Sequence, residues 1–180
     1  MVSGMSPLDA LIIFILIISS WYAVSHVVAH RFNKSVVKGC GCAVERWIGG
    51  PNSLYISLLC NNDKIEMFIN RLPWDNPVNL LAAFAAGRRP YVAARFMLPI
   101  DIGVADASRS GTGRKIGDYY VVNRSTPKDV LEKMLSYAAE RGIWRVTASG
   151  RSVQLIMPGT DCGKALSAAL GFVKLFSSNG

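Results

Sequence analysis

The chain has 180 residues, of which 51% are apolar and only 18% carry a formal charge. This composition excludes an intrinsically disordered chain and a long solvated coiled coil, and four cysteines are too few for a miniprotein built on disulfides. The formal net charge is +8, and every charged residue except Asp9 lies beyond residue 30. The length allows one modest domain.

The first element is an apolar segment near the N-terminus. Residues 10–30 form 21 consecutive positions without a formal charge. At 1.5 Å per residue this segment spans the ~30 Å hydrocarbon layer of a bilayer. A cleaved secretory signal would have a basic region before a shorter apolar stretch, and residues 1–9 contain neither Lys nor Arg. We therefore predict a short tail over 1–9 and a transmembrane helix over 10–30.

The charges that flank this segment predict its orientation. Arg31, Lys34, Lys38 and Arg46 follow it, whereas no basic side chain precedes it. The positive-inside rule then places the N-terminus outside the cell and the C-terminal part in the cytoplasm, with these basic residues near anionic lipid. Residues 31–53 are rich in glycine and read as a juxtamembrane linker.

Residues 54–178 alternate between strand and helix patterns, which predicts one domain. Residues 126–142 give the clearest helix, with Thr126 as N-cap, Pro127 at the first position and Asp129 completing a capping box. The fold class is α+β, a small mixed or antiparallel sheet with helices packed on one face. The other expected elements are a hairpin over 54–60 and 64–70, a helix over 77–86 capped by Asn76, strands over 91–98 and 119–123, a loop over 101–117, a hairpin over 144–148 and 152–157, and a helix over 161–176.

The second half of the domain resembles a known family. It reads "RRPYVAARFMLPIDIGV", a glycine-rich loop, "IGDYYVVNRSTPKDVLEKML" with Gly117 and Asp118, and then "WRVTASGRSVQLIMPG" before a last helix. Over residues 88–176 this order resembles an uncharacterised α+β domain of membrane-anchored bacterial and archaeal proteins. The resemblance implies the fold and a bacterial or archaeal origin, but no catalytic residue.

Cysteines and histidines supply the candidate metal ligands. Cys40 and Cys42 could bind a soft metal, with Cys60 and Cys162 completing a four-sulfur site, or they could be acylated beside the membrane. The Cys-Gly-Cys spacing differs from the usual zinc knuckle, and a cytoplasmic domain would not favour disulfides in a mesophile, although hyperthermophiles are an exception. Cys60 and Cys162 are therefore interpreted as small buried apolar residues. His26 and His30 share one helix face, where we expect them to lie at headgroup level rather than bind a metal or haem.

The basic residues of the domain are candidates for contact with an anionic partner or lipid. The loop over 108–115 lacks both the P-loop and the dinucleotide-binding patterns, and no nucleic-acid-binding motif is recognisable. Lipid or an acidic partner is therefore favoured over nucleic acid. Besides those beside the anchor, the candidate residues are Arg88, Arg89, Arg109, Arg114 and Lys115.

No catalytic residue and no cofactor are predicted. Both histidines lie in the anchor, so the domain has no imidazole base for a Ser-His or Cys-His pair, and carboxylates such as Asp101 and Asp106 read as solvated loop residues. We expect a single-pass, non-catalytic accessory or assembly subunit of a membrane complex. The alternatives are a membrane-tethered binder of nucleic acid or another polyanion, and a metal or redox protein that uses the Cys-Gly-Cys pair.

Overall fold

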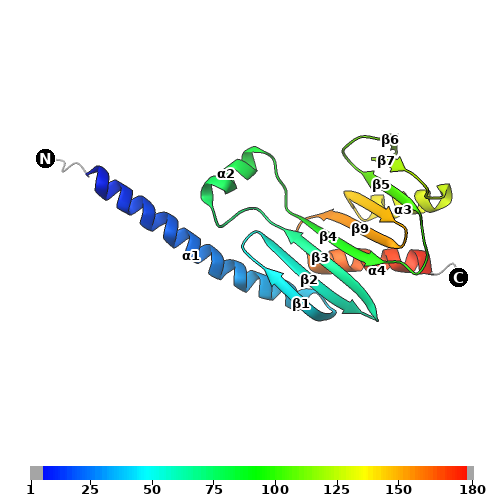
Figure 1. Ribbon diagram of the computed structural model, residues 1–180, viewed down its shortest axis with the longest axis horizontal. Coiled ribbons are helices and arrows are strands. Elements are labelled where there is room, and N and C mark those ends of the chain that lie inside the picture. Colours follow the sequence, from blue (N-terminus) through cyan, green and yellow to red (C-terminus); the bar gives the residue numbers. More distant parts are fainter. Residues whose placement is uncertain (1–5, 178–180) are drawn as a thin grey trace.

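The computed structural model describes residues 6–177 as a long helix that projects from a sheet domain (Figure 1). The helices are α1 (Pro7–Gly39), α2 (Pro77–Ala85), α3 (Lys128–Glu140) and α4 (Cys162–Ser177). The strands are β1 (Ala43–Gly49), β2 (Ser53–Cys60), β3 (Asp63–Asn70), β4 (Tyr91–Met97), β5 (Val104–Ser108), β6 (Arg114–Ile116), β7 (Tyr119–Asn123), β8 (Arg145–Ser149) and β9 (Ser152–Pro158). The predicted α+β class is confirmed.

Helix α1 is longer than the predicted span. It begins with a capping box in which Ser6 and Asp9 exchange hydrogen bonds, and it continues for 33 residues, or about 50 Å. No residue of its 18-residue apolar window is buried, and it is the one helix in the described part of the chain that is long and apolar enough to cross a membrane. The start at Pro7 places the end of the predicted 1–9 tail inside the helix, while residues 1–5 lie outside the described part.

The predicted linker over 31–53 is wrong. Helix α1 continues to Gly39, and β1 forms an edge strand over Ala43–Gly49. The helix continues because Asn33 is buried against the domain and Val36 and Val37 pack on its core, so tertiary contacts stabilise the last turns. The glycines of this segment mark a turn rather than a flexible tether.

Among the described residues, nine strands form a single antiparallel sheet in the order β1-β2-β3-β4-β9-β8-β5-β7-β6. The predicted β2–β3 hairpin is confirmed, with Asn61 and Asn62 both at positive φ as a tight two-residue turn requires. The predicted loop over 101–117 is wrong in part, because it contains β5 and β6. Strand β5 is short and pairs only with strands distant in sequence, and β6 is a three-residue strand paired with the β7 that follows it, so local periodicity reveals neither.

One face of the sheet carries the core. Helix α4 packs on β3 and β4, and α3 lies over β8, on the same face of the sheet (Figure 1). The predicted apolar stripe of α3 is confirmed, since Leu131, Met134, Leu135 and Ala138 are buried. Its predicted capping is wrong. Pro127 occupies the N-cap, and the Thr126 backbone N–H donates to Asn123 Oδ1 at 2.9 Å.

Helix α2 departs from this arrangement. It begins at the predicted cap, where Asn76 Oδ1 accepts hydrogen bonds from the backbone N–H groups of Val78 and Asn79 at 3.0 and 3.2 Å. It does not cover the sheet. Instead it projects from the domain on the side where α1 emerges (Figure 1).

Candidate functional site

Two disulfides use all four cysteines. Cys40, at the end of α1, is bonded to Cys162 at the start of α4, and Cys42 is bonded to Cys60 at the end of β2. The predicted metal pair of Cys40 and Cys42 is therefore wrong for this structure, because the two sulfurs have different covalent partners and neither is a thiolate. Cys60 and Cys162 are buried as predicted, but they are bonded rather than free. The described residues contain no other cluster of metal ligands.

A polar cluster joins α1 to the domain. Asn33 is buried on α1, and its Nδ2 donates to the Gly50 carbonyl at 3.2 Å. Arg71, just after β3, donates from Nη2 to Asn33 Oδ1 and to the same carbonyl, the latter at 3.1 Å. Its guanidinium lies 5.0 Å from the centre of the Phe32 ring. These contacts and the Cys40–Cys162 disulfide make α1 a rigid extension of the domain.

Arg71 has no acidic partner among the described residues, since no ion pair of this part of the chain includes it. Its Nε is buried and has no hydrogen-bond partner within the described part. Burial lowers the pKa of the guanidinium, which nevertheless stays protonated at neutral pH. The protein therefore holds a partly buried positive charge that lacks a counter-charge.

An apolar groove of about 830 Å³ begins beside Arg71. One wall is a single face of α1 from Ile13 to Phe32, on which the lining residues recur every three or four positions. Pro51, Arg71 and Trp74 complete the lining from the domain side. The α1 wall lies almost wholly within the uncharged segment, so the groove runs from the level of Arg31 toward the N-terminal end of the helix.

The segment after Arg71, from Trp74 through α2, carries exposed apolar side chains. Trp74 lies beside the uncharged part of α1. The Trp21 indole N–H donates to the Trp74 carbonyl at 2.8 Å, which places Trp74 well inside the uncharged part of α1. On α2, Val78 and Leu81 are 68% and 70% exposed, and Phe84 is 54% exposed. Residues 76–87 contain no charge. A patch of this kind on a water-facing surface would be unusual.

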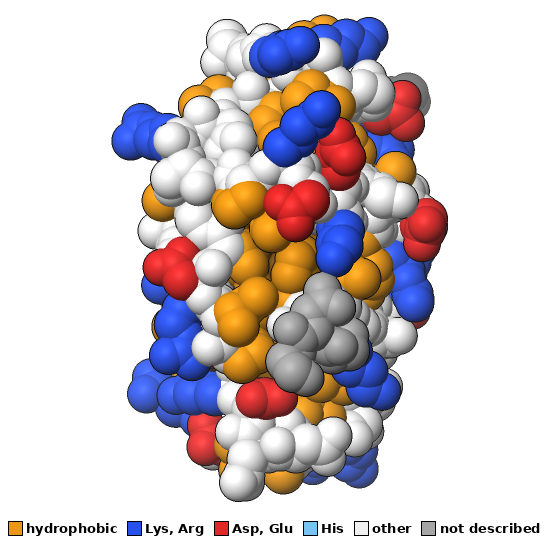
Figure 2. Space-filling model, turned by 90° about the vertical axis from the view of Figure 1, so that its right-hand side faces the viewer, with side chains coloured by type: hydrophobic (Ala, Val, Ile, Leu, Met, Phe, Trp, Pro, Cys, Tyr) orange, Lys and Arg blue, Asp and Glu red, His pale blue; other side chains and the backbone are white. Residues whose placement is uncertain are grey.

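The predicted basic residues do not form one patch. Arg31, Lys34 and Lys38 are exposed on α1, Arg88 and Arg89 follow α2, and Arg109, Arg114 and Lys115 lie around β5 and β6. Arg46 on β1 is at the opposite sheet edge from β6, eight strand spacings or about 38 Å away. On the end of the domain seen in Figure 2, basic side chains alternate with acidic ones around apolar atoms. The candidate basic residues are therefore divided between separate elements of the chain.

The two histidines of α1 have aromatic neighbours. The His26 ring lies 4.3 Å from the Tyr22 ring, and the His30 ring lies 6.0 Å from the ring of Trp47 on β1. Neither histidine belongs to a group of three or more metal-ligating side chains in the described part of the chain.

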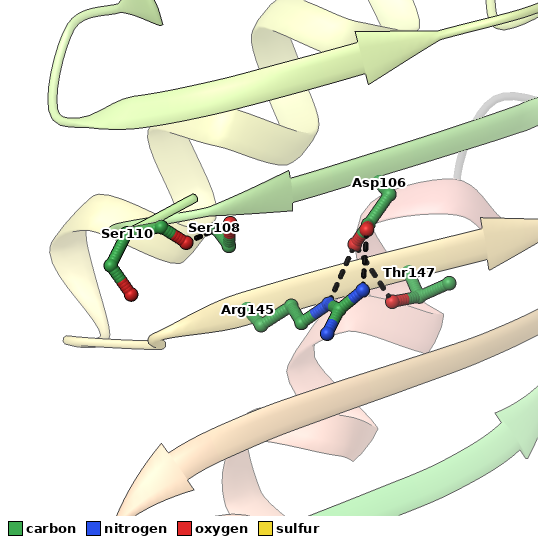
Figure 3. A network of polar contacts seen from close by, with 5 residues as sticks. All are labelled: Asp106, Ser108, Ser110, Arg145 and Thr147. Atoms are coloured by element: carbon green, nitrogen blue, oxygen red, sulfur yellow. Dashed lines mark hydrogen bonds and ion pairs between the residues drawn. The ribbon is translucent and has the colours of Figure 1, made fainter. Parts of the chain in front are cut away.

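The uncovered face of the sheet carries a polar cluster (Figure 3). Arg145 Nε donates to Asp106 Oδ1 at 2.8 Å and Nη2 donates to Oδ2 at 2.5 Å, while Thr147 Oγ1 donates to Oδ1 at 3.0 Å. The hydrogen bonds from Arg145 hold the pKa of Asp106 below its usual range. Asp101 Oδ1 accepts a hydrogen bond from the Gly103 backbone N–H at 2.8 Å. Asp106 lies in β5 and is held by Arg145, so it is not the solvated loop residue that we predicted, whereas Asp101 is an exposed loop residue as predicted.

Sequence reasoning missed Asn33, Arg71 and Trp74. Arg71 stands among residues that read as the end of a strand, and nothing nearby in the sequence indicates that it meets α1. A weak signal existed in the uncharged run over 76–87, which is followed at once by Arg88 and Arg89. This pattern is typical of a segment at a membrane surface.

Comparison with protein-family models gives no match for this chain, and comparison with curated proteins gives none either. The resemblance of residues 88–176 to an uncharacterised family therefore stays a prediction. The functional argument consequently depends on the geometry described above.

Proposed function

We propose that this protein is a single-pass membrane protein that acts as a non-catalytic assembly or accessory subunit of a membrane complex. The observation that carries the proposal is the rigid joint between α1 and the domain, formed by Asn33, Arg71 and the Cys40–Cys162 disulfide. An enzyme tethered to a membrane needs only a flexible linker, whereas a fixed joint sets the height and orientation of the domain. Such control is what an assembly subunit requires.

Helix α2 supplies a second membrane contact in this proposal. With residues 10–30 across the bilayer, the Trp21–Trp74 hydrogen bond lies about 15 Å along α1 from Arg31, the first charge after the uncharged segment. Trp74 and the exposed face of α2 then meet lipid rather than water, and Arg88 and Arg89 lie near the headgroups. The hydrogen bond also satisfies the Trp21 N–H, which we would otherwise expect at an interface.

The disulfides are evidence for the side of the membrane on which the domain lies. Positive-inside bias predicts the cytoplasm, but two disulfides that use every cysteine are typical of an oxidising compartment. We place the domain on the extracytoplasmic side, since a reduced domain would lose both covalent links. Protease treatment of intact cells should then remove a C-terminal epitope tag. A tag that is cut only after the cells are opened would instead support the cytoplasmic orientation.

The subunit role is tested by mild-detergent purification from native membranes, followed by mass spectrometry of the proteins that co-purify. We expect a stoichiometric membrane partner. The test variant carries Asn33→Leu and Arg71→Leu, which loosen the joint without changing the apolar span. It should lose the partner while staying in the membrane, and the wild-type chain is its control. A protein that leaves the membrane as a lone 20-kDa species would contradict the proposal.

The polyanion alternative has less support, because the basic residues are divided between α1, the end of α2 and the β5–β6 region. If it were correct, a domain fragment would bind nucleic acid with a strong dependence on salt. The metal alternative needs reduced Cys40 and Cys42, which are disulfide-bonded here.

A further inference from the structure

We infer that the groove between α1 and Trp74 is a binding site for one membrane phospholipid, with an acyl chain along α1 and the phosphate at Arg71. The inference relies on the membrane anchor of the proposed function, but not on the subunit role. It concerns a ligand of the chain itself rather than a protein partner.

The shape and lining of the groove fit an acyl chain. Its volume of about 830 Å³ lies in the range of pockets that hold a small-molecule ligand. Between Ile13 and Phe32 the α1 wall is about 28 Å long, and its polar side-chain groups are the hydroxyls of Ser20 and Ser25 and the Trp21 indole N–H, which is bonded to the Trp74 carbonyl. Because this wall belongs to the uncharged segment, the groove opens to the hydrocarbon layer, where lipid chains are the surrounding solvent.

The charge at the end of the groove identifies the headgroup. Arg71 contacts Phe32 and Asn33, next to Arg31, the first charged residue after the uncharged segment. This is the level at which lipid phosphates lie when residues 10–30 cross the bilayer. Hydrogen bonds to the described residues engage only Nη2 of Arg71, and no carboxylate in this part of the chain neutralises the guanidinium. A planar guanidinium binds a phosphate through two parallel hydrogen bonds.

A partner transmembrane helix is the competing occupant, since Ser25 and Ala29 are small residues of the kind found between packed helices. It accounts for the apolar wall but supplies nothing for Arg71. An apolar helix in the groove would leave the partly buried guanidinium without a counter-charge. The phospholipid satisfies both parts of the site.

The test uses the full chain, purified in a mild detergent and titrated with phosphatidylglycerol, with bound lipid counted by native mass spectrometry. We expect one lipid to bind. Val24 lines the groove and is 61% exposed, whereas Val27 is 56% exposed on α1 and does not line it. Val24→Trp should block the groove and abolish lipid binding, and the matched Val27→Trp variant should bind as the wild type does.

The headgroup contact is tested with diacylglycerol of the same chains, which lacks the phosphate. We expect diacylglycerol to bind at least about tenfold more weakly, because the charge-assisted hydrogen bonds are lost. Arg71→Leu should weaken phosphatidylglycerol binding to the same degree.

Equal binding of the two lipids would overturn the assignment of Arg71. Equal loss in both tryptophan variants would overturn the groove as the site. Val24→Trp that keeps the lipid but loses a co-purifying subunit would assign the groove to a partner helix. If Arg71→Leu does not fold, the comparison of the two valine variants still decides the inference.

Discussion

The two disulfides should differ in how much they stabilise the domain, because they close loops of very different length. The Cys40–Cys162 bond joins residues 122 positions apart, and the Cys42–Cys60 bond joins residues only 18 apart. Loop-closure entropy of the unfolded chain then gives about 4.9 kcal/mol for the first and about 3.2 kcal/mol for the second. In a protein of this size 1 kcal/mol shifts Tm by about 2–4 °C.

We therefore expect a Cys40→Ala/Cys162→Ala variant to lose about 10–20 °C in Tm, and a Cys42→Ala/Cys60→Ala variant to lose about 6–13 °C. Both variants remove two sulfur atoms, so lost packing contributes to each. The assay is thermal unfolding of the full chain in detergent, followed by circular dichroism without reductant. Wild-type protein in reductant serves as the control and should fall below either variant.

The order of the Tm values of the two variants tests whether loop closure determines the stabilisation. If the Cys42–Cys60 variant were the less stable of the two, loop closure would not be the dominant effect. If reductant left Tm unchanged, the disulfides would contribute nothing to stability, and the argument for an oxidising compartment would lose its basis. Alkylation of free thiols before and after reduction measures independently how many cysteines are bonded.

Three further predictions concern single side chains. Because the folded-state pKa of Asp106 is lowered, its ion pair should stabilise the protein fully above about pH 4 and lose this effect as the pH falls further. Asp106→Asn should remove that dependence in acid titrations of Tm, at a cost below about 1 kcal/mol near neutral pH, since the pair is partly exposed. Leu81→Lys should reduce quenching of Trp74 fluorescence by lipids brominated on their acyl chains, measured against Trp74→Phe; unchanged quenching would contradict the membrane contact of α2. Tyr119→Phe removes the buried 2.6 Å hydrogen bond to the Ile143 carbonyl and should cost about 1–3 kcal/mol in chemical denaturation, whereas a loss near zero would mean that water replaces the hydroxyl.

Much of the domain was predictable from local patterns. The α3 stripe of Leu131, Met134 and Leu135 follows helical periodicity, and the Asn61-Asn62 turn marks the β2–β3 hairpin. The cap of α2 was found for the same reason, since Asn76 bonds only to its near neighbours. Short strands such as β5 escaped prediction, because pairing with β7 and β8 stabilises them rather than any preference of their own residues.

In the candidate site, too, some features were predictable from the sequence and others depend on the tertiary structure. Composition and charge alone determined that an uncharged segment long enough to span a bilayer precedes a chain of net positive charge, because a run of 21 residues without charge is a local property. The tertiary structure decided where α1 ends, which cysteines pair and where Arg71 lies. Asn33 and Arg71 are 38 positions apart, and Cys40 and Cys162 are 122 apart. Only packing of the helix against the folded sheet brings such groups together, so the groove and its unneutralised guanidinium exist in three dimensions and leave no pattern along the chain.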